Sequence, residues 1–163
     1  MDFLYRNALW AALLASVGAL ATAFTSQYVF GLWPCVLCLY QRWPYAVVIA
    51  IALIGISLRR KVGSGALLVL CAIGFATTAA IGGFHVGVEQ GWWEGTAECV
   101  GDTSKALSLQ DLKAQIMSAP VVRCDDVAWS LFGISMAGFN VIAAGIMTVF
   151  SLAAALHSSK VQK

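Results

Sequence analysis

Charged residues are scarce in this chain: 11% of its 163 residues are charged, whereas a soluble domain carries about 25%. So few charges cannot cover a soluble surface, and 60% of the residues are hydrophobic, so the composition predicts a membrane protein. The net charge of +2 is small, and no basic cluster is interleaved with aromatic residues. The small net charge and the lack of a basic cluster exclude nucleic acid as a partner.

Long tracts of the sequence also lack Asp, Glu, Lys and Arg altogether. These tracts cover residues 7–41, 43–58, 62–88 and 127–159. Because a membrane-spanning helix needs about 20 apolar residues, we predict one helix for each tract. The expected spans lie near residues 8–28, 40–58, 65–84 and 129–152. The predicted fold class is an all-α membrane protein, a four-helix transmembrane bundle that forms a single domain over residues 1–163.

Only residues 85–128 form a connection long enough to be a functional loop. Within it, Ser108 followed three residues later by Asp111 resembles a capping box, which predicts a helix that runs to about Met117. Its apolar side chains share one face: Leu109, Leu112 and Ile116. The pattern predicts a short amphipathic helix in the second outer loop, lying on the membrane surface or packed on the bundle.

Basic residues are distributed unevenly among the expected connections, and this asymmetry predicts the orientation. Six of the ten lie at the termini or between the second and third spans: Arg6, Arg59, Arg60, Lys61, Lys160 and Lys163. We therefore expect both termini and the 59–64 turn in the cytoplasm, with residues 29–38 and 85–128 outside. A cleaved signal peptide over residues 1–24 is the alternative, but the uncharged tract continues to Gln41, which favours a retained helix.

The chain contains five cysteines. Cys35, Cys38, Cys99 and Cys124 fall on the expected outer side or at its membrane edge, where an oxidising compartment permits disulfides. Proximity suggests a Cys35–Cys38 pair and a Cys99–Cys124 loop pair, but four cysteines allow three connectivities. Cys71 falls inside an expected span and is predicted to be inert, because a free buried cysteine packs as a small hydrophobic side chain.

The stretch WPCVLCLYQRWPY, residues 33–45, places a Cys-x-x-Cys dithiol at the start of the second expected helix. Pro34 favours a helix start. Cys35 and Cys38 are therefore predicted to share one face of the first turn, where free N–H groups and the helix dipole stabilise a thiolate. A structural clip is the alternative, but so short a loop gains little from cross-linking. The pattern favours a redox-active dithiol.

Arg42 and His85 are the polar side chains expected at the depth of this dithiol. Arg42 lies four residues after Cys38, hence on the same face, where it can stabilise a thiolate or hydrogen-bond a carbonyl acceptor. A snorkelling interfacial side chain is the alternative for Arg42. His85 is either an interfacial histidine or a partner of a membrane-dissolved cofactor, with Glu89 on its other nitrogen if the helix continues. Asn140, at mid-span, predicts an interhelical hydrogen bond.

These features together resemble the DsbB family of disulfide bond formation proteins, over nearly the whole chain. The residues that carry the resemblance are Pro34-Cys35-Val36-Leu37-Cys38 with Tyr40 and Arg42, then Cys99 and Cys124, then Trp129, Gly133 and Ser135 before the last helix. The stretch from His85 to Trp92-Trp93 is similar to one branch of the family. Gln41 stands where some members carry an acid.

The resemblance implies a thiol:quinone oxidoreductase in the bacterial inner membrane, with its cysteines on the periplasmic side. A reduced DsbA-like protein with a thioredoxin fold attacks Cys99 of a Cys99–Cys124 disulfide. Released Cys124 attacks Cys35 of a Cys35–Cys38 disulfide, and freed Cys38 lies beside ubiquinone or menaquinone, which accepts the electrons. The implied site residues are the catalytic Cys35, Cys38, Cys99 and Cys124 and the quinone-binding Arg42 and His85. No metal is implied.

Three other readings compete with this one. A zinc site on the four outer cysteines is disfavoured because Cys99 and Cys124 lack the tight spacing of a second Cys-x-x-Cys. An outward thiol reductase needs cysteines on two spans, and only Cys71 is available. A structural membrane protein with two disulfides is the third.

Overall fold

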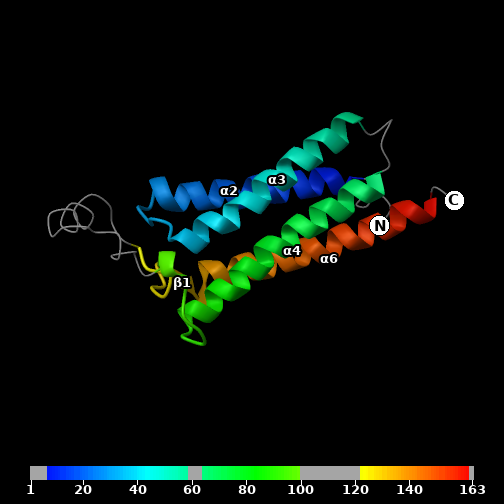
Figure 1. Ribbon diagram of the computed structural model, residues 1–163. Coiled ribbons are helices and arrows are strands. Elements are labelled where there is room, and N and C mark those ends of the chain that lie inside the picture. The colour runs from blue at the N-terminus through cyan, green and yellow to red at the C-terminus, as the bar shows by residue number, and fades with distance from the viewer. Residues whose placement is uncertain (1–6, 59–63, 100–121, 162–163) are drawn as a thin grey trace, which may run out of the picture.

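Four long helices dominate the fold of this protein (Figure 1). The structure is a computed structural model, and it describes residues 7–58, 64–99 and 122–161. The helices are α2 (Ala8–Tyr28), α3 (Val36–Leu58), α4 (Ser64–Glu89) and α6 (Met136–Val161). Each contains a stretch long and apolar enough to cross a membrane. The predicted four-helix membrane fold is therefore confirmed.

Three of the helices differ in their bounds from the expected spans. α3 begins at Val36 rather than near residue 40, because Cys35 caps it at the membrane edge. α4 continues to Glu89, one turn beyond the expected end, because Val86 and Val88 extend its apolar surface. α6 begins at Met136 instead of residue 129. The amphipathic helix expected over residues 108–117 lies outside the described residues.

Between the helices, the described chain forms two short elements that the sequence did not indicate. A turn of 3-10 helix, η1 (Ala97–Cys99), follows α4. A hairpin of β1 (Ser130–Leu131) and β2 (Ile134–Ser135) precedes α6, with Leu131 opposite Ile134. The connecting residues Phe132 and Gly133 both have positive φ, 52° and 77°, as a two-residue type I′ turn requires. The hairpin displaces the start of α6 by about two turns.

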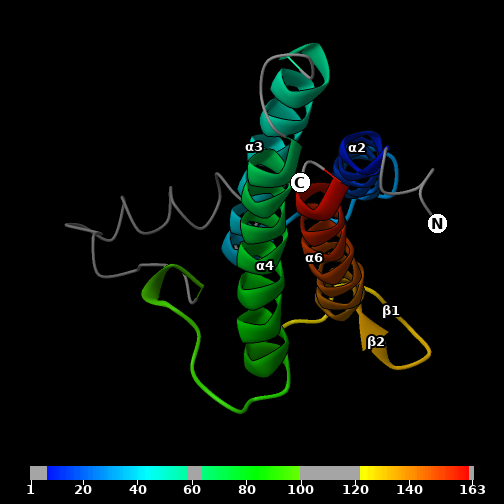
Figure 2. The same cartoon turned by 90° about the vertical axis from the view of Figure 1, so that its right-hand side faces the viewer.

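α4 packs against both α3 and α6, and α2 packs against α3 (Figures 1 and 2). Small residues of α4 permit the close approaches. A side chain at Gly74 would meet Val48 of α3 at 2.5 Å, and one at Gly82 would meet Asn140 of α6 at 3.1 Å. α4 is therefore in close contact with its neighbours on both sides.

The main core lies towards the end of the bundle where α2 begins and α6 ends. Ala8, Leu9 and Ala12 of α2 meet Ala154 and Ala155 of α6 there. Cys71 belongs to the same cluster and is fully buried, which agrees with a packing role. The other end of the bundle carries the remaining cysteines.

Candidate functional site

Cys35 is the residue that caps α3. Its carbonyl accepts the first helical hydrogen bond, from Leu39 N–H at 3.1 Å, and its Sγ accepts the N–H of Cys38 at 3.4 Å. A side chain that accepts from the third helical residue satisfies one of the free donors of the helix start. We had predicted that Cys35 lies in the first turn, but it precedes that turn, and Pro34 lies outside the helix.

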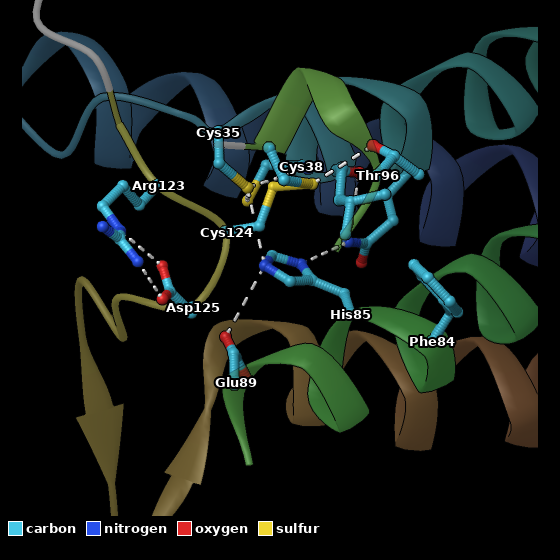
Figure 3. Close-up of a disulfide and its surroundings, with 12 residues drawn as sticks. Cys35, Cys38, Phe84, His85, Glu89, Thr96, Arg123, Cys124 and Asp125 are labelled. Atoms are coloured by element: carbon cyan, nitrogen blue, oxygen red, sulfur yellow. Dashed lines mark hydrogen bonds and ion pairs between the residues drawn. A yellow bond between two sulfur atoms is a disulfide. The ribbon is translucent and has the colours of Figure 1, made fainter. Parts of the chain in front are cut away.

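The two thiols of this motif lie close together and next to His85 (Figure 3). Cys35 Sγ is 3.2 Å from Cys38 Sγ and 3.5 Å from His85 Nε2. The pair is a dithiol here, not the disulfide that we expected, and the two states differ by two electrons and two protons. Hydrogen bonding from the Cys38 side chain lowers the pKa of Cys35, as does His85, whereas burial opposes the shift.

The second cysteine pair is a disulfide. Cys99 and Cys124 are bonded, with a Cα–Cα distance of 5.2 Å, and Cys124 is fully buried. Both pack with Cys35, Leu37 and Val88 in one cluster, beside which Cys38 lies. Two cysteine pairs that are far apart in the sequence therefore share one buried pocket of side chains, as a disulfide exchange between them requires.

His85 is buried and is bonded through both ring nitrogens. Its Nδ1 lies 3.0 Å from Nε2 of Gln41, and its Nε2 faces Cys35 Sγ and, at 3.8 Å, Glu89 Oε1. Glu89 was expected on the other nitrogen; the continued helix instead brings it to the nitrogen that Cys35 also contacts. The second oxygen of Glu89 accepts a hydrogen bond from Ser135 Oγ.

Gln41 is the site residue that the sequence reasoning missed. Its side chain is buried between α3, α4 and α6, and its Oε1 accepts from Asn140 Nδ2 at 2.7 Å. Asn140 thus makes the interhelical bond that we predicted for it, and Tyr45 O–H donates to its Oδ1 at 2.5 Å. One signal was available: Gln41 is three residues after Cys38, so a polar side chain shares the face of the dithiol.

Arg42 reaches from α3 across to α2. Its Nη1 donates to Gln27 Oε1 at 2.7 Å, and its guanidinium carbon lies 5.1 Å from the centre of the Phe24 ring, within the range of a cation–π contact. Its Nε is buried and has no hydrogen-bond partner among the described residues. Because unpaired buried N–H groups are rare in proteins, this N–H is a donor available to an acceptor that the described residues do not supply.

A cavity of about 460 Å³ lies beside Arg42 and the dithiol. Its walls are mainly apolar, from α2 (Ala19, Leu20 and Ala23) and α6 (Ala137, Phe139 and Ala143). The polar lining includes Cys38, Gln41, Arg42, His85 and Glu89 around the dithiol, together with Thr22, Ser26, Tyr45, Arg123, Asp126 and Asn140. An apolar cavity of this size with a few convergent polar groups is typical of a site for an organic ligand.

The ligand atoms of Cys35, Cys38 and His85 lie within 4.8 Å of one another, which is close enough for a metal ion. The hydrogen bonding is wrong for one, however. The amide nitrogen of Gln41 can only donate, so Nδ1 of His85 must accept and its Nε2 carries the hydrogen. A protonated nitrogen is not a ligand, so this group does not fit a metal.

Comparison with known proteins agrees with this arrangement. The family model described as "Disulfide bond formation protein DsbB" matches residues 5–154. The chain is 31% identical to Disulfide bond formation protein B of Albidiferax ferrireducens over 153 residues, which covers 86% of this chain and 81% of that one. It is 32% identical to the uncharacterized protein RP370 of Rickettsia prowazekii over 129 residues, 78% of this chain and 74% of the other.

Similarity extends to a third relative, Disulfide bond formation protein B of Neisseria meningitidis serogroup A. The identity there is 36% over 110 residues, which covers 62% of this chain and 63% of the relative. No solved structure gives a significant match.

Proposed function

Since the chain belongs to the DsbB family of disulfide bond formation proteins, we propose that it is a membrane thiol:quinone oxidoreductase. The chain is a multi-pass membrane protein. In the proposed reaction it reoxidises a DsbA-like dithiol protein of the periplasm and passes the two electrons to ubiquinone, or to menaquinone. The observation that carries the proposal is the single buried cluster of two cysteine pairs beside an apolar cavity.

The proposed exchange begins at the loop disulfide. A thiolate of the reduced partner attacks Cys99, which forms a mixed disulfide and releases Cys124 as a thiolate. Cys124 then attacks Cys35 of the Cys35–Cys38 disulfide, and Cys38 leaves with the electron pair of the broken bond. The presence of Cys124 and Cys35 in one buried cluster supports this step.

The partner leaves when its second thiolate attacks its own mixed-disulfide sulfur and releases Cys99. Cys99 then attacks Cys124, re-forms the loop disulfide and releases Cys35. The sum is one disulfide gained by the partner and one lost by the Cys35–Cys38 pair. The product state has a Cys99–Cys124 disulfide and two thiols at Cys35 and Cys38, which is the combination found in the structure.

The cavity fits a quinone in size, in its apolar walls and in its polar end. The buried Nε–H of Arg42 has no partner among the described residues and is a suitable donor for a quinone carbonyl oxygen. His85, at the same end, is a second candidate for contact. A bound quinone supplies the two-electron acceptor that returns Cys35 and Cys38 to a disulfide. The protein's part is to hold the acceptor and to keep the thiols reactive.

The proposed location is the bacterial inner membrane, with both termini in the cytoplasm and the cysteines on the periplasmic side. The distribution of Lys and Arg supports it, because six of ten lie at the termini or in the connection between α3 and α4. An oxidising periplasm also suits the Cys99–Cys124 disulfide.

Quinone absorbance tests the proposal directly. Purified protein mixed with a reduced DsbA-like protein and ubiquinone should reduce the quinone in amounts equal to the partner oxidised. Cys38→Ser should abolish turnover, because the second thiol of the acceptor pair is lost. Cys71→Ser should retain nearly full activity, because Cys71 packs in the core away from the cavity. No quinone reduction by protein with intact cysteines would rule the proposed reaction out.

A further inference from the structure

A continuous chain of hydrogen bonds connects α6 and α3 to His85. Gln41 is its central member: Oε1 accepts from Asn140 Nδ2 at 2.7 Å, and Nε2 lies 3.0 Å from His85 Nδ1. Gln41 is 7% exposed and His85 is 3% exposed, so both side chains are buried. Each group in such a place must satisfy its hydrogen bonds within the protein.

The orientation of the Gln41 amide follows from its backbone neighbour. Its Nε2 lies 3.3 Å from the carbonyl oxygen of Leu37, which can only accept. The amide nitrogen must therefore face Leu37 and His85, and the amide oxygen must face Asn140. Any rotation that exchanged the two atoms would set two acceptors against each other at Leu37.

The orientation of Asn140 is fixed in the same way. Its Nδ2 lies 3.4 Å from the backbone oxygen of Thr78, and its Oδ1 accepts from Tyr45 O–H. The hydrogens thus run in one direction, from Tyr45 to Asn140, to Gln41 and to His85. A chain with its direction fixed at both amides leaves Nδ1 of His85 only one role, that of acceptor.

A neutral imidazole that accepts at Nδ1 carries its hydrogen on Nε2. That nitrogen faces Cys35 Sγ at 3.5 Å and Glu89 Oε1 at 3.8 Å. Both atoms are good acceptors when they carry charge. Cys35 Sγ also accepts from Cys38 N–H at 3.4 Å, so its sulfur has donors on two sides.

We propose that Gln41, held by Asn140, is a positioning residue that fixes the tautomer of His85 so that Nε2–H is directed at the sulfur of Cys35. The consequence is that Cys35 accepts a hydrogen bond when it is released as a thiolate. The inference rests on the proposed function for its purpose, since Cys35 is the leaving thiolate when Cys99 attacks Cys124 and re-forms the loop disulfide. Its geometry does not depend on the quinone.

Other charges around the dithiol bear on any pH dependence of Cys35. Besides Cys35 itself, the titratable or charged groups that line the same cavity are Cys38, Arg42 and Tyr45 of α3, His85 and Glu89 of α4, and Arg123 and Asp126. Arg42 is held on α2 by Gln27 and Phe24, and Arg123 is paired with Asp125 at 2.6 Å. Of these groups, His85 of α4 lies within hydrogen-bond distance of Cys35 across the helix interface.

The first test uses the wild-type chain and needs no substitution. Full-length protein labelled with ¹⁵N in its histidine rings is reduced and studied in lipid nanodiscs without quinone or partner. The ¹⁵N shifts should place the hydrogen of His85 on Nε2, with the His85→Ala spectrum identifying its signals. A hydrogen on Nδ1 of neutral His85 would overturn the proposal.

The second test follows the reactivity of Cys35 by alkylation with iodoacetamide between pH 3 and 9, with the modified cysteine identified by mass spectrometry. Gln41→Met keeps the length of the side chain but cannot donate, so the midpoint of the pH profile should rise by about one unit, which is about a tenfold lower rate at a pH below both midpoints. Gln41→Glu should restore the wild-type midpoint, because its carboxylate accepts from Nδ1–H of a doubly protonated His85, whose Nε2 still donates. A merely structural role predicts no such rescue by a buried charge.

Ser151→Ala is the matched control, since Ser151 is also buried and polar but lies elsewhere on α6; its alkylation profile should equal that of wild type. An unchanged profile in Gln41→Met would overturn the proposal. If Gln41→Met does not fold, the ¹⁵N spectrum of the wild-type protein and the alkylation profile of Gln41→Glu still test the proposal. Neither measurement involves quinone. A failure to reduce quinone would therefore contradict the proposed function but leave this inference standing.

Discussion

At the scale of single residues, Arg42 uses different atoms for its contacts with α2 and for its unpaired hydrogen-bond donor. Nη1 is occupied by Gln27 and the guanidinium plane rests on Phe24, so α2 holds the side chain in place. Nε alone is buried without a partner among the described residues. A planar, always charged group whose buried Nε–H has no partner among the described residues is well suited to a carbonyl acceptor, and Lys could not reproduce that geometry.

Arg42→Met should therefore weaken quinone use selectively. A hydrogen bond from a charged group contributes about 1.5–3 kcal/mol, so the KM for quinone should rise about 10- to 100-fold while the KM for the DsbA-like partner stays near the wild-type value. Steady-state rates with each substrate varied in turn measure both. Trp43→Phe, at an exposed neighbouring position, serves as the control. Equal increases in the two KM values would contradict a quinone contact.

At the scale of the elements, the turn of the hairpin before α6 holds Phe132 in an unfavourable backbone conformation with its side chain exposed. Phe132 has a φ of 52° and is 92% exposed. The left-handed conformation costs an ordinary residue about 1–2 kcal/mol, while Asn and Gly adopt it readily. The ring of Phe132 buries almost nothing in return within the chain.

Phe132→Asn should raise the stability of the protein, because Asn-Gly is the favoured pair for a type I′ turn. The expected gain in free energy of unfolding is about 1 kcal/mol, measured by SDS titration in mixed micelles. Gly133→Ala, at a φ of 77°, should change stability in the opposite direction. A loss of stability in Phe132→Asn would mean that the phenyl ring is bound by lipid instead.

The elements also show what sequence patterns can and cannot predict. Counting uncharged residues found all four helices, because spanning a membrane is a demand on composition. It misplaced the start of α6, because the hairpin residues Ser130 to Ser135 are as uncharged as the helix that follows. Spacing drew attention to Cys35, Cys38 and Arg42, which lie within two turns of one helix. Gln41 escaped notice because it has no charge and its partners are 44 and 99 positions away.

At the scale of the whole molecule, the bundle has two distinct ends. One is closed by the core cluster around Cys71 and Phe75, and the other holds the cavity, the dithiol and the loop disulfide. Exposed aromatic side chains such as Trp33, Trp92 and Trp93 gather at the second end, as expected at a membrane–water boundary. The proposed orientation puts this end at the periplasm.

Labelling of single introduced cysteines tests that orientation. Trp93→Cys should react with a membrane-impermeant maleimide in cells whose outer membrane alone is permeabilised. Ser158→Cys, at the opposite end of the bundle, should react only after the inner membrane is broken. Comparison with the unsubstituted chain accounts for the native cysteines. The reverse labelling pattern would show that the protein is inserted the other way round.

The hydrogen-bonded chain from Tyr45 to His85 also has a consequence for how the helices assemble in the bilayer. It joins α3, α4 and α6 through two amides within membrane-spanning helices. Sliding α6 along its neighbours by one turn, about 5.4 Å, would separate Asn140 from its partners Gln41, Tyr45 and Thr78 and leave Oε1 of Gln41 without its donor. The hydrogen bonds that orient His85 therefore also fix the axial position of α6 against α3 and α4. A bundle assembled in another register would lack the orientation of His85 towards Cys35.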